Sequence, residues 1–376
     1  MSMPPINVMV KPASSNCNLN CKYCFYRDVA ENRDKKSYGL MSEDTLEILV
    51  KRVFEYGEKF VGFAFQGGEP TLVGLDFYKK LIELEDKYNV NKIKVNNSIQ
   101  TNGMLIDEEW AEFLVQNNFL VGLSLDGPAD VQNLNRIDLQ GKGSFSRVAK
   151  SIEIFNKYKV EYNILCTVTK SVASHIEKIY RYYTKSGFKY LQFIPCLDEL
   201  GGKPGENPYS LKPDDYESFL KKLFDLWYKD FIEGKGVSIR MFDNIVQMLL
   251  GYHPESCDMK GCCSVNTVIE ADGSVYPCDF YVLNQWKLGN VLNDNLKELI
   301  TSEKGSNFVE ISTDASENCS SCEYVSICRG GCRRHYEPIG NGKIGENYFC
   351  SAYKGFYKYS IDRFYHITKI VSSNWN

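Results

Sequence analysis

Three cysteines near the start of the chain have the spacing Cys17-x3-Cys21-x2-Cys24, and thiolates are ligands for zinc and for iron–sulfur clusters. Three thiolates on one short loop can hold three irons of a four-iron cubane and leave the fourth iron without a protein ligand. A structural zinc ion needs four ligands, usually from paired Cys-x2–4-Cys knuckles, and this loop offers only three. The spacing therefore favours an iron–sulfur cluster with one open iron.

A second, denser group of cysteines lies toward the C-terminus. It consists of Cys319, Cys322, Cys328, Cys332 and Cys350, with Cys257, Cys262, Cys263 and Cys278 upstream. Thiolates in this number suit either iron–sulfur clusters or a pair of zinc ribbons, and their spacing does not separate the two metals. We do not expect disulfides, because the chain starts without a secretory signal pattern and the cytosol keeps thiols reduced.

The first loop, written with its tyrosine as Cys17-x3-Cys21-x-Tyr23-Cys24, resembles the signature of the radical S-adenosylmethionine (SAM) superfamily. In that superfamily the open iron chelates the amino and carboxylate groups of SAM. The segment Gln66–Pro70 resembles the superfamily's GGEP motif, which binds the methionine amino group, and its glycines allow a close backbone approach. The resemblance implies a SAM pocket lined by Tyr23, Gly67, Gly68, Glu69, Ser124, Arg136 and Leu197. Taken alone, Ser124 or Leu197 could equally be a residue that packs at a strand end.

The segment Cys263-x9-Gly273-x4-Cys278 resembles the opening of a SPASM domain, and the later cysteines resemble its centre. SPASM domains bind two auxiliary [4Fe-4S] clusters. The resemblance implies that Cys257, Cys263, Cys278 and Cys332 hold one cluster and that Cys319, Cys322, Cys328 and Cys350 hold the other. Cys262 adjoins Cys263 and stays an alternative ligand. If all eight thiols bind iron, no auxiliary iron is open and electron transfer is the natural role.

Nearly the whole chain resembles the anaerobic sulfatase-maturating enzymes, most closely in Lys11–Ser15, Phe65–Thr71, Gln100–Gly103, Leu123–Pro128 and Asp272–Tyr281. These enzymes convert a Cys or Ser side chain of a protein substrate to formylglycine. A 5′-deoxyadenosyl radical from SAM removes the β-hydrogen, and the substrate's electron leaves to an auxiliary cluster. The resemblance implies a substrate with a Cys/Ser-x-Pro/Ala-x-Arg motif and an electron donor of the flavodoxin or ferredoxin type.

The residue expected to act as the general base is Asp279, which directly follows Cys278 in an aromatic stretch. In the family that aspartate takes the proton from the substrate thiol or hydroxyl. Burial would make a carboxylate a better base near neutral pH, whereas the plainer interpretation is a solvated aspartate in a turn. Tyr26 and Gln66 are expected to contact the substrate by their positions.

The composition narrows the classes of partner. Net charge is −4, from 44 basic and 48 acidic residues, so the chain has no strong basic excess for nucleic acid. A hydrophobic content of 43% is that of a soluble globular protein. No apolar run approaches the roughly 18 residues that a membrane span requires. We therefore expect a cytoplasmic enzyme that binds neither nucleic acid nor membrane.

The elements that must position these residues alternate between strands and helices in the first half. The expected strands are Ile6–Val10, Phe60–Phe65, Ile93–Ile99, Phe119–Leu125, Val160–Val168 and Tyr190–Ile194. The expected helices are one from Ser42 to Gly57, then Leu75–Tyr88, Asp107–Gln116, Ser144–Tyr158 and Ala173–Lys185. Six β-α units predict an α/β fold, a partial (β/α)6 TIM-like barrel with its site at the C-terminal strand ends.

The loop that begins near Leu200 marks a boundary, which divides the chain into a radical SAM partial barrel over residues 1–210 and a SPASM domain with a terminal helix over residues 211–376. Two alternatives remain open. One is a SPASM enzyme that forms thioether or carbon–carbon bonds in a ribosomal peptide, and the other is a non-catalytic zinc-binding module. The module would not need the six β-α units. The sequence does not name the substrate protein, the electron donor, the oligomeric state or the choice between Cys and Ser.

Overall fold

Residues 5–313, 317–336 and 345–373 are described by a computed structural model of the chain. The chain forms two compact units, each assembled from separate stretches of sequence. The first unit comprises Met1–Ser124, Arg136–Tyr162 and Ser264–Val309, and the second comprises Leu125–Asn135, Asn163–Cys263 and Glu310–Asn376. The segment that carries Cys278 and Asp279 therefore folds with the N-terminal strands.

The first unit is built on a sheet with the strands β1 (Ile6–Val10), β2 (Phe60–Phe65), β3 (Lys94–Thr101), β4 (Leu120–Ser124), β8 (Val268–Ile269), β9 (Ser274–Tyr276) and β10 (Gly289–Asn290). Their order is β10-β9-β8-β1-β2-β3-β4. The strands from β8 to β4 in this order are parallel, whereas β9 is antiparallel to both of its neighbours. Because parallel strands end at the same edge of a sheet, the loops after β1, β2 and β3 lie together.

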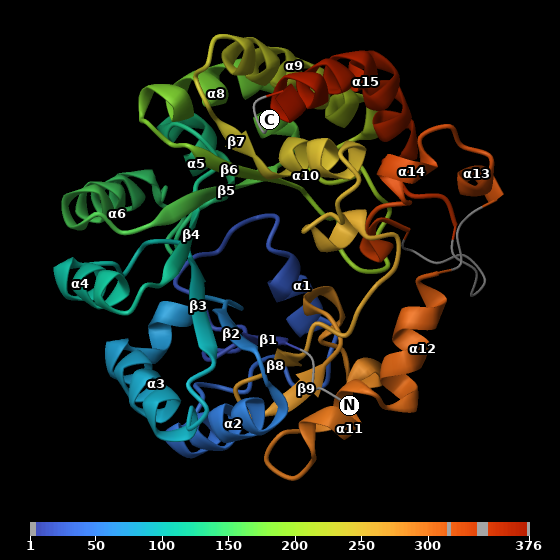
Figure 1. Cartoon of the computed structure of the whole chain (residues 1–376). Coiled ribbons are helices and arrows are strands. Elements are labelled where there is room, and N and C mark those ends of the chain that lie inside the picture. Colours follow the sequence, from blue (N-terminus) through green and yellow to red (C-terminus); the bar gives the residue numbers. More distant parts are fainter. Residues whose placement is uncertain (1–4, 314–316, 337–344, 374–376) are drawn as a thin grey trace. The chain divides into compact units, whose positions relative to one another are not determined.

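Four amphipathic helices of this unit are α2 (Glu43–Tyr56), α3 (Leu75–Tyr88), α4 (Glu108–Gln116) and α6 (Phe145–Tyr158), and it also contains α1 (Phe25–Glu31), α11 (Leu296–Ile300) and most of α12 (Glu303–Ile311). The side chain of Ser42 begins α2 by accepting a hydrogen bond from the Thr45 amide (3.1 Å). The stripe of Leu46, Leu49 and Val53 on α2 is fully buried. Figure 1 shows α2 and α3 side by side outside the blue strands, so these helices cover this part of the sheet.

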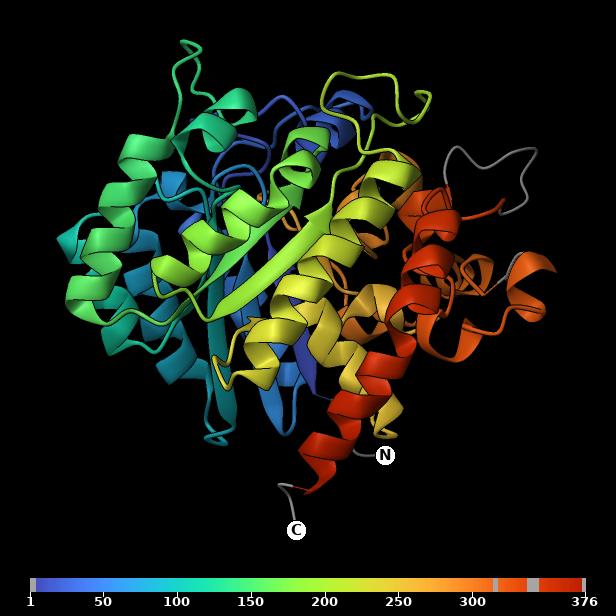
Figure 2. The same cartoon turned by 90° about the horizontal axis from the view of Figure 1, so that it is seen from above.

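The second unit contains the parallel strands β5 (Tyr162–Val168), β6 (Tyr190–Pro195) and β7 (Ser238–Ile239) in that order. Its helices are α5 (Ala129–Asn135), α7 (Lys170–Ser174), α8 (Ile176–Lys185), α9 (Pro213–Ile232), α10 (Arg240–Leu249), α13 (Glu317–Ser320), α14 (Val325–Cys328) and α15 (Cys350–Ser373). The long helices α9 and α15 run side by side (Figure 2). Aromatic side chains fill the space between them, and the ring centroids of Phe224 and Phe364 are 4.6 Å apart.

The predicted α/β class is confirmed, and several elements have the predicted bounds. The strands Ile6–Val10 and Phe60–Phe65 and the helix Leu75–Tyr88 begin and end as expected. The single helix expected over Ala173–Lys185 is wrong, because two helices, α7 and α8, occupy this region. Thr169 explains the earlier start, since its hydroxyl accepts a hydrogen bond from the Val172 amide (3.4 Å) and caps α7. Neither α1 nor α10 was predicted.

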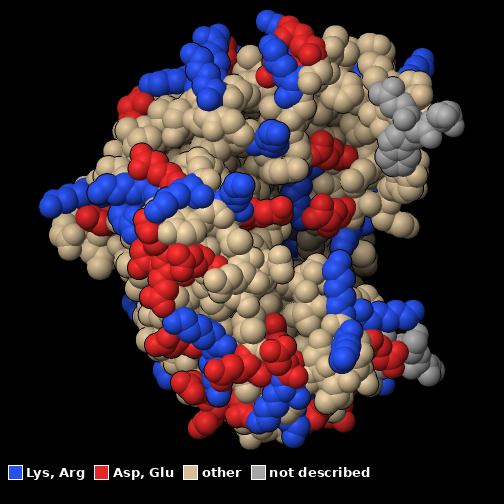
Figure 3. Space-filling model, turned by 60° about the vertical axis from the view of Figure 1, so that its left-hand side comes forward, with Lys and Arg blue, Asp and Glu red and all other residues tan. Residues whose placement is uncertain are grey.

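Charged side chains of both signs are distributed over the surface. On the face drawn in Figure 3, Lys and Arg lie interspersed with Asp and Glu, as expected from 44 basic and 48 acidic residues. Within the described ranges, none of the helices combines the length and the apolar character that crossing a membrane would require.

Candidate active site

The three cysteines of the first loop lie between β1 and α1, at the edge where the parallel strands end. Cys24 stands directly before α1, and its amide donates to the Cys21 carbonyl (3.2 Å). The Cys17 sulfur accepts a hydrogen bond from the Leu19 amide (3.4 Å). Burial, followed by the charge of Glu69, raises the pKa of the Cys17 thiol to about 12. Because an iron ligand must be a thiolate, assembly of the predicted cluster on this loop would displace that proton.

The Gly67-Gly68 pair packs closely against the backbone that leads into the cysteine loop. The Gly68 amide donates to the Ser14 carbonyl (2.8 Å), and the next amide along the chain donates to the Asn16 carbonyl (2.8 Å). A Cβ atom at Gly68 would lie 2.0 Å from the Asn16 oxygen, and Gly67 has a φ of +135° that favours glycine. Only glycines allow this approach, so the pair fixes the chain one residue before Cys17.

The Glu69 carboxylate lies in the interior and joins the loops after β2 and β3. It accepts hydrogen bonds from the hydroxyls of Thr71 (2.6 Å) and Thr101 (2.7 Å), and from the Asn102 amide (2.7 Å). Burial raises the pKa of Glu69, while these donors lower it. The Asn102 side chain in turn lies 3.7 Å from the Cys17 sulfur. Glu69 thus positions the surroundings of the cluster loop, and its predicted contact with SAM stays a prediction.

The other residues expected at the SAM pocket divide between the two units. Tyr23 and Arg136 are both nearly buried, and the Arg136 guanidinium carbon lies 5.5 Å from the centroid of the Tyr23 ring. Ser124 ends β4, at the same edge as the cysteine loop. Leu197 belongs to the second unit, where it lines a cavity together with Asp198. The structure therefore brings the first three residues to one edge within the first unit.

Asp279 opens the turn that follows Cys278, and it meets side chains from the ends of two neighbouring strands. Its Oδ1 atom forms an ion pair with Nζ of Lys11, which follows β1. Its Oδ2 atom accepts a hydrogen bond from Nε2 of Gln66 (3.2 Å), which follows β2. The Lys11 side chain is completely buried, whereas 13% of the Asp279 side chain is exposed. Two of the residues predicted for catalysis and substrate contact, Asp279 and Gln66, thus lie in direct contact.

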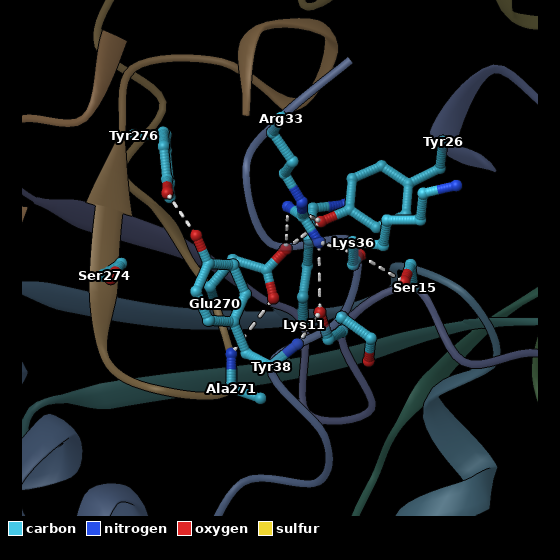
Figure 4. Close-up of polar contacts among 12 residues, drawn as sticks. Lys11, Ser15, Tyr26, Arg33, Lys36, Tyr38, Glu270, Ala271, Ser274 and Tyr276 are labelled. Carbon is cyan, nitrogen blue, oxygen red and sulfur yellow. Dashed lines mark hydrogen bonds and ion pairs between the residues drawn. The ribbon is translucent and has the colours of Figure 1, made fainter. Parts of the chain in front are cut away.

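Tyr26 takes part in a buried network rather than presenting a free hydroxyl. Its hydroxyl donates to Oε1 of Glu270, which also pairs with Nη1 of Arg33 at 2.6 Å. Burial, followed by the charge of Glu270, holds the pKa of Tyr26 well above its usual value. The Lys11 ammonium lies 3.7 Å from the centre of the same ring. Figure 4 shows these side chains converging from α1 itself and from the segments that follow β1, α1 and β8.

Sequence reasoning missed Lys11, Arg33 and Glu270. A usable signal existed for two of them, since Lys11 and Glu270 each directly follow a short apolar strand, where a charged residue needs a partner. Their adjacency depends on the parallel pairing of β1 with β8, in which Val10 lies opposite Ile269. A pairing between residues so distant in sequence leaves no local pattern.

One of the two predicted auxiliary ligand sets surrounds a single cavity in the second unit. Its lining includes all four cysteines of the set together with aromatic and aliphatic side chains and one lysine: Cys319, Cys322, Cys328, Cys350, Tyr324, Val325, Tyr357 and Lys354. Burial raises the pKa of Cys328 to about 11 and that of Cys350 to about 12. Four thiols around one largely apolar cavity fit a closed [4Fe-4S] cluster.

The other predicted set is divided between the units. Cys278 belongs to the first unit, whereas Cys257, Cys263 and Cys332 belong to the second. Burial raises the pKa of Cys332 to about 12, and the thiols of Cys263 and Cys257 add to the effect, so these three are neighbours. Cys262 is exposed, while the partly buried Cys263 donates its amide to the Ser312 hydroxyl (2.8 Å). This environment favours Cys263 over Cys262 as the ligand.

Comparison with protein families gives two matches. The model described as the radical SAM superfamily matches residues 12–183, and the one described as an iron–sulfur cluster-binding domain, SPASM, matches residues 261–323. The first match includes Cys17, Cys21 and Cys24, and the second includes Cys262, Cys263, Cys278, Cys319 and Cys322.

Curated relatives are similar over almost the whole chain. A cysteine-type anaerobic sulfatase-maturating enzyme of Clostridium perfringens is 50% identical over 98% of this chain and 100% of its own length. One of the same type from Clostridium novyi is 49% identical, over 98% and 99%. A serine-type anaerobic sulfatase-maturating enzyme of Bacteroides thetaiotaomicron is 34% identical, over 94% and 88%.

Among solved structures, native anSMEcpe with bound AdoMet and Cp18Cys peptide is 49% identical, with a TM-score of 0.94 over 98% of this chain and 100% of that chain. The predicted partial-barrel architecture is thereby confirmed. SuiB of Streptococcus suis, bound to its precursor peptide SuiA, has a TM-score of 0.64 at 18% identity, over 93% of this chain and 76% of that chain, which shows the fold alone.

Proposed function

Because the chain belongs to the anaerobic sulfatase-maturating enzymes of the radical SAM superfamily, we propose that it oxidises a cysteine side chain of a sulfatase-type protein to Cα-formylglycine. The observation that carries the proposal is the placement of Asp279, with its neighbours Lys11 and Gln66, at the strand ends that also bear the cysteine loop. The proposed base and the cysteine loop proposed to hold the radical SAM cluster thus belong to the same edge of the sheet.

The cofactors are SAM and a [4Fe-4S] cluster, with further clusters in the SPASM domain. When bound, they supply a carbon-centred radical that removes a hydrogen atom and clusters that accept an electron. We assign Cys17, Cys21 and Cys24 to the SAM-binding cluster and the eight thiols named above to the auxiliary clusters. Tyr23, Gly67, Gly68, Glu69, Ser124, Arg136 and Leu197 are proposed to bind SAM or to shape its pocket.

The protein's own chemical contribution is a proton acceptor. For a cysteine substrate, loss of a hydrogen atom from Cβ, a proton from sulfur and one electron leaves a carbon–sulfur double bond. Asp279 is proposed to receive that proton on its carboxylate, while the Gln66 amide orients the carboxylate through Oδ2. Water then replaces sulfur, which leaves as hydrogen sulfide, and the aldehyde of formylglycine remains.

Cysteine rather than serine is the proposed substrate residue. The relatives at 49–50% identity are of the cysteine type, and the serine-type relative from Bacteroides is 34% identical. We further propose recognition of a Cys-x-Pro/Ala-x-Arg motif, reduction by a flavodoxin or ferredoxin, and a cytoplasmic location. The chain is proposed to divide functionally near residue 210, between barrel and SPASM domain.

The deciding experiment is anaerobic turnover of the reconstituted protein with reductant, SAM and a peptide that contains Cys-x-Pro-x-Arg. We expect formylglycine and 5′-deoxyadenosine to appear together in the mass spectra, and the matched Ser peptide to react more slowly. Deoxyadenosine with a cross-linked peptide in place of formylglycine would overturn the proposal and favour a peptide-modifying enzyme.

A further inference from the structure

Lys11 belongs to none of the ligand or substrate sets above, yet its side chain is completely buried beside the proposed base. A buried ammonium is costly unless an opposite charge compensates it. In the described part of the chain its one ion pair is with Oδ1 of Asp279. The position therefore requires a carboxylate as its partner.

We propose that Lys11 is a positioning residue for the reaction: its ammonium fixes Oδ1 of Asp279, so that the carboxylate faces the substrate in one orientation. The inference rests on the proposed function, because it assigns a role toward the base of that reaction. Among the described residues, the side chain of Asp279 would keep only its hydrogen bond from Gln66 if Lys11 were replaced. That bond holds Oδ2 and leaves Oδ1 without a fixed partner.

The Lys11 ammonium is itself held by a series of buried contacts that runs through Tyr26, Glu270 and Arg33. It lies over the Tyr26 ring, 3.7 Å from the centroid, and the Tyr26 hydroxyl is anchored on Glu270. Glu270 is paired with Arg33 inside the protein. Arg33 is tied to the cysteine-loop side of the sheet through the Ser14 hydroxyl at 3.2 Å. The orientation of Asp279 is thus linked to Ser14, whose carbonyl accepts the hydrogen bond from the Gly68 amide.

Charge balance supports the assignment of roles within this network. Two cations, Lys11 and Arg33, are matched by two anions, Asp279 and Glu270, and each cation has its own carboxylate. The Arg33–Glu270 pair is completely enclosed and serves the fold. In the Lys11–Asp279 pair one partner is partly exposed, as a residue that meets a substrate must be.

The test compares Lys11→Met with wild type. The methionine keeps an apolar stem of similar length over the tyrosine ring but removes the charge. We expect the kcat for formylglycine to fall about 10- to 100-fold, as for a misplaced catalytic group, with little change in the KM for the peptide. SAM cleavage should continue, so the ratio of 5′-deoxyadenosine to formylglycine rises. The exposed Lys35, 5.2 Å from the Tyr38 ring, provides the matched control Lys35→Met, which should leave both values unchanged.

Two further variants separate positioning from folding. Lys11→Arg retains the charge and should restore most of the rate, whereas Lys11→Gln retains a donor without charge and should not. If Lys11→Met fails to load iron, the comparison of formylglycine rates between Lys11→Arg and Lys11→Gln tests the same role. When Asp279→Asn is already present, adding Lys11→Met should not lower the kcat for formylglycine further, since Lys11 and Asp279 act through one interaction.

Certain outcomes would overturn the inference. One is a Lys11→Met enzyme with wild-type iron content and an unchanged ratio of 5′-deoxyadenosine to formylglycine. The other is a double variant in which the rate losses of Lys11→Met and Asp279→Asn add in full. Absence of formylglycine from the wild-type enzyme would instead refute the proposed function, which keeps the two failures distinct.

Discussion

Glu69 and Asn102 are joined by a 2.7 Å hydrogen bond from the Asn102 backbone amide to the Glu69 carboxylate. The same asparagine directs its side-chain amide at the Cys17 sulfur, 3.7 Å away. A buried carboxylate in the loop after β2 is therefore linked, through the residue that follows β3, to the surroundings of Cys17, a proposed cluster ligand.

Replacing Asn102 with Leu should lower the reduction potential of the radical SAM cluster. An N–H group near a ligand sulfur stabilises the reduced, more negative cluster, and its loss removes that effect. Anaerobic redox titration followed by electron paramagnetic resonance would measure the shift. A potential equal to that of wild type would show that this contact has no electronic role.

Gly68→Ala should prevent assembly of the first cluster. The added Cβ would lie 2.0 Å from the Asn16 oxygen, so the backbone before Cys17 must move. Iron should fall from about twelve to about eight atoms per chain, since three cubanes contain four irons each. Gly345→Ala is the matched control, because a Cβ there meets no atom of the described residues within 4 Å.

Measurement of bound iron can also decide whether Cys262 or Cys263 is the cluster ligand. Cys263→Ser should reduce iron to about eight atoms per chain, whereas Cys262→Ser should leave about twelve. The reason is that Cys263 contributes to the raised pKa of Cys332, while Cys262 is exposed to solvent. The reverse pattern would make Cys262 the ligand.

Asp279→Asn should preserve SAM cleavage while formylglycine production falls about 10²- to 10⁴-fold, the usual range for removal of a general base. The substitution also leaves the buried Lys11 ammonium without its anion, which destabilises the protein. The double variant Asp279→Asn/Lys11→Met should therefore melt at a higher temperature than Asp279→Asn alone. Formylglycine at the wild-type rate would remove Asp279 as the base.

Glu85 should make stability depend on pH. It lies buried between α3 and β3, and among the described residues its carboxylate accepts one hydrogen bond, from the Asn97 side-chain amide (3.1 Å). Burial raises the pKa of Glu85 from 4.5 to about 7. Between these two values the folded state binds the proton more tightly than the unfolded chain. The contribution of protonated Glu85 to the free energy of unfolding is therefore fully present below about pH 4.5. It falls as the pH rises toward 7 and is lost above that value.

Glu85→Gln should abolish this dependence and stabilise the protein above pH 7 by up to about 3 kcal/mol, at roughly 1.4 kcal/mol per pK unit. Anaerobic thermal melts at pH 6 and pH 8 measure the effect. Glu83 on the same helix is two-thirds exposed, so Glu83→Gln should shift neither melting temperature appreciably. Equal pH dependence in Glu85→Gln and wild type would contradict the assignment.

Much of the fold followed from local pattern. Ser42 as a cap and the alternation of apolar runs with helices located most elements of the first half within a few residues. The site was only partly predictable. Compact sequence motifs contain Asp279, Gln66 and the cysteines. By contrast, the pairing of β1 with β8 is what brings Lys11 and Glu270 together. Such a pairing is set by the packing of the whole first unit, so no short window of sequence contains it.

The dependence of the first unit on β8 and β9 has a consequence during synthesis of the protein. The cysteine loop leaves the ribosome about 250 residues before the segment that supplies Cys278 and Asp279. At synthesis rates of about 5–20 residues per second the interval is on the order of tens of seconds. Until it ends, β1 has an unpaired edge and Lys11 has no counter-ion. A nascent chain in that interval has an exposed strand edge and an uncompensated cation, so we expect the first unit to reach its final packing only after the segment with β8 and β9 has been synthesised.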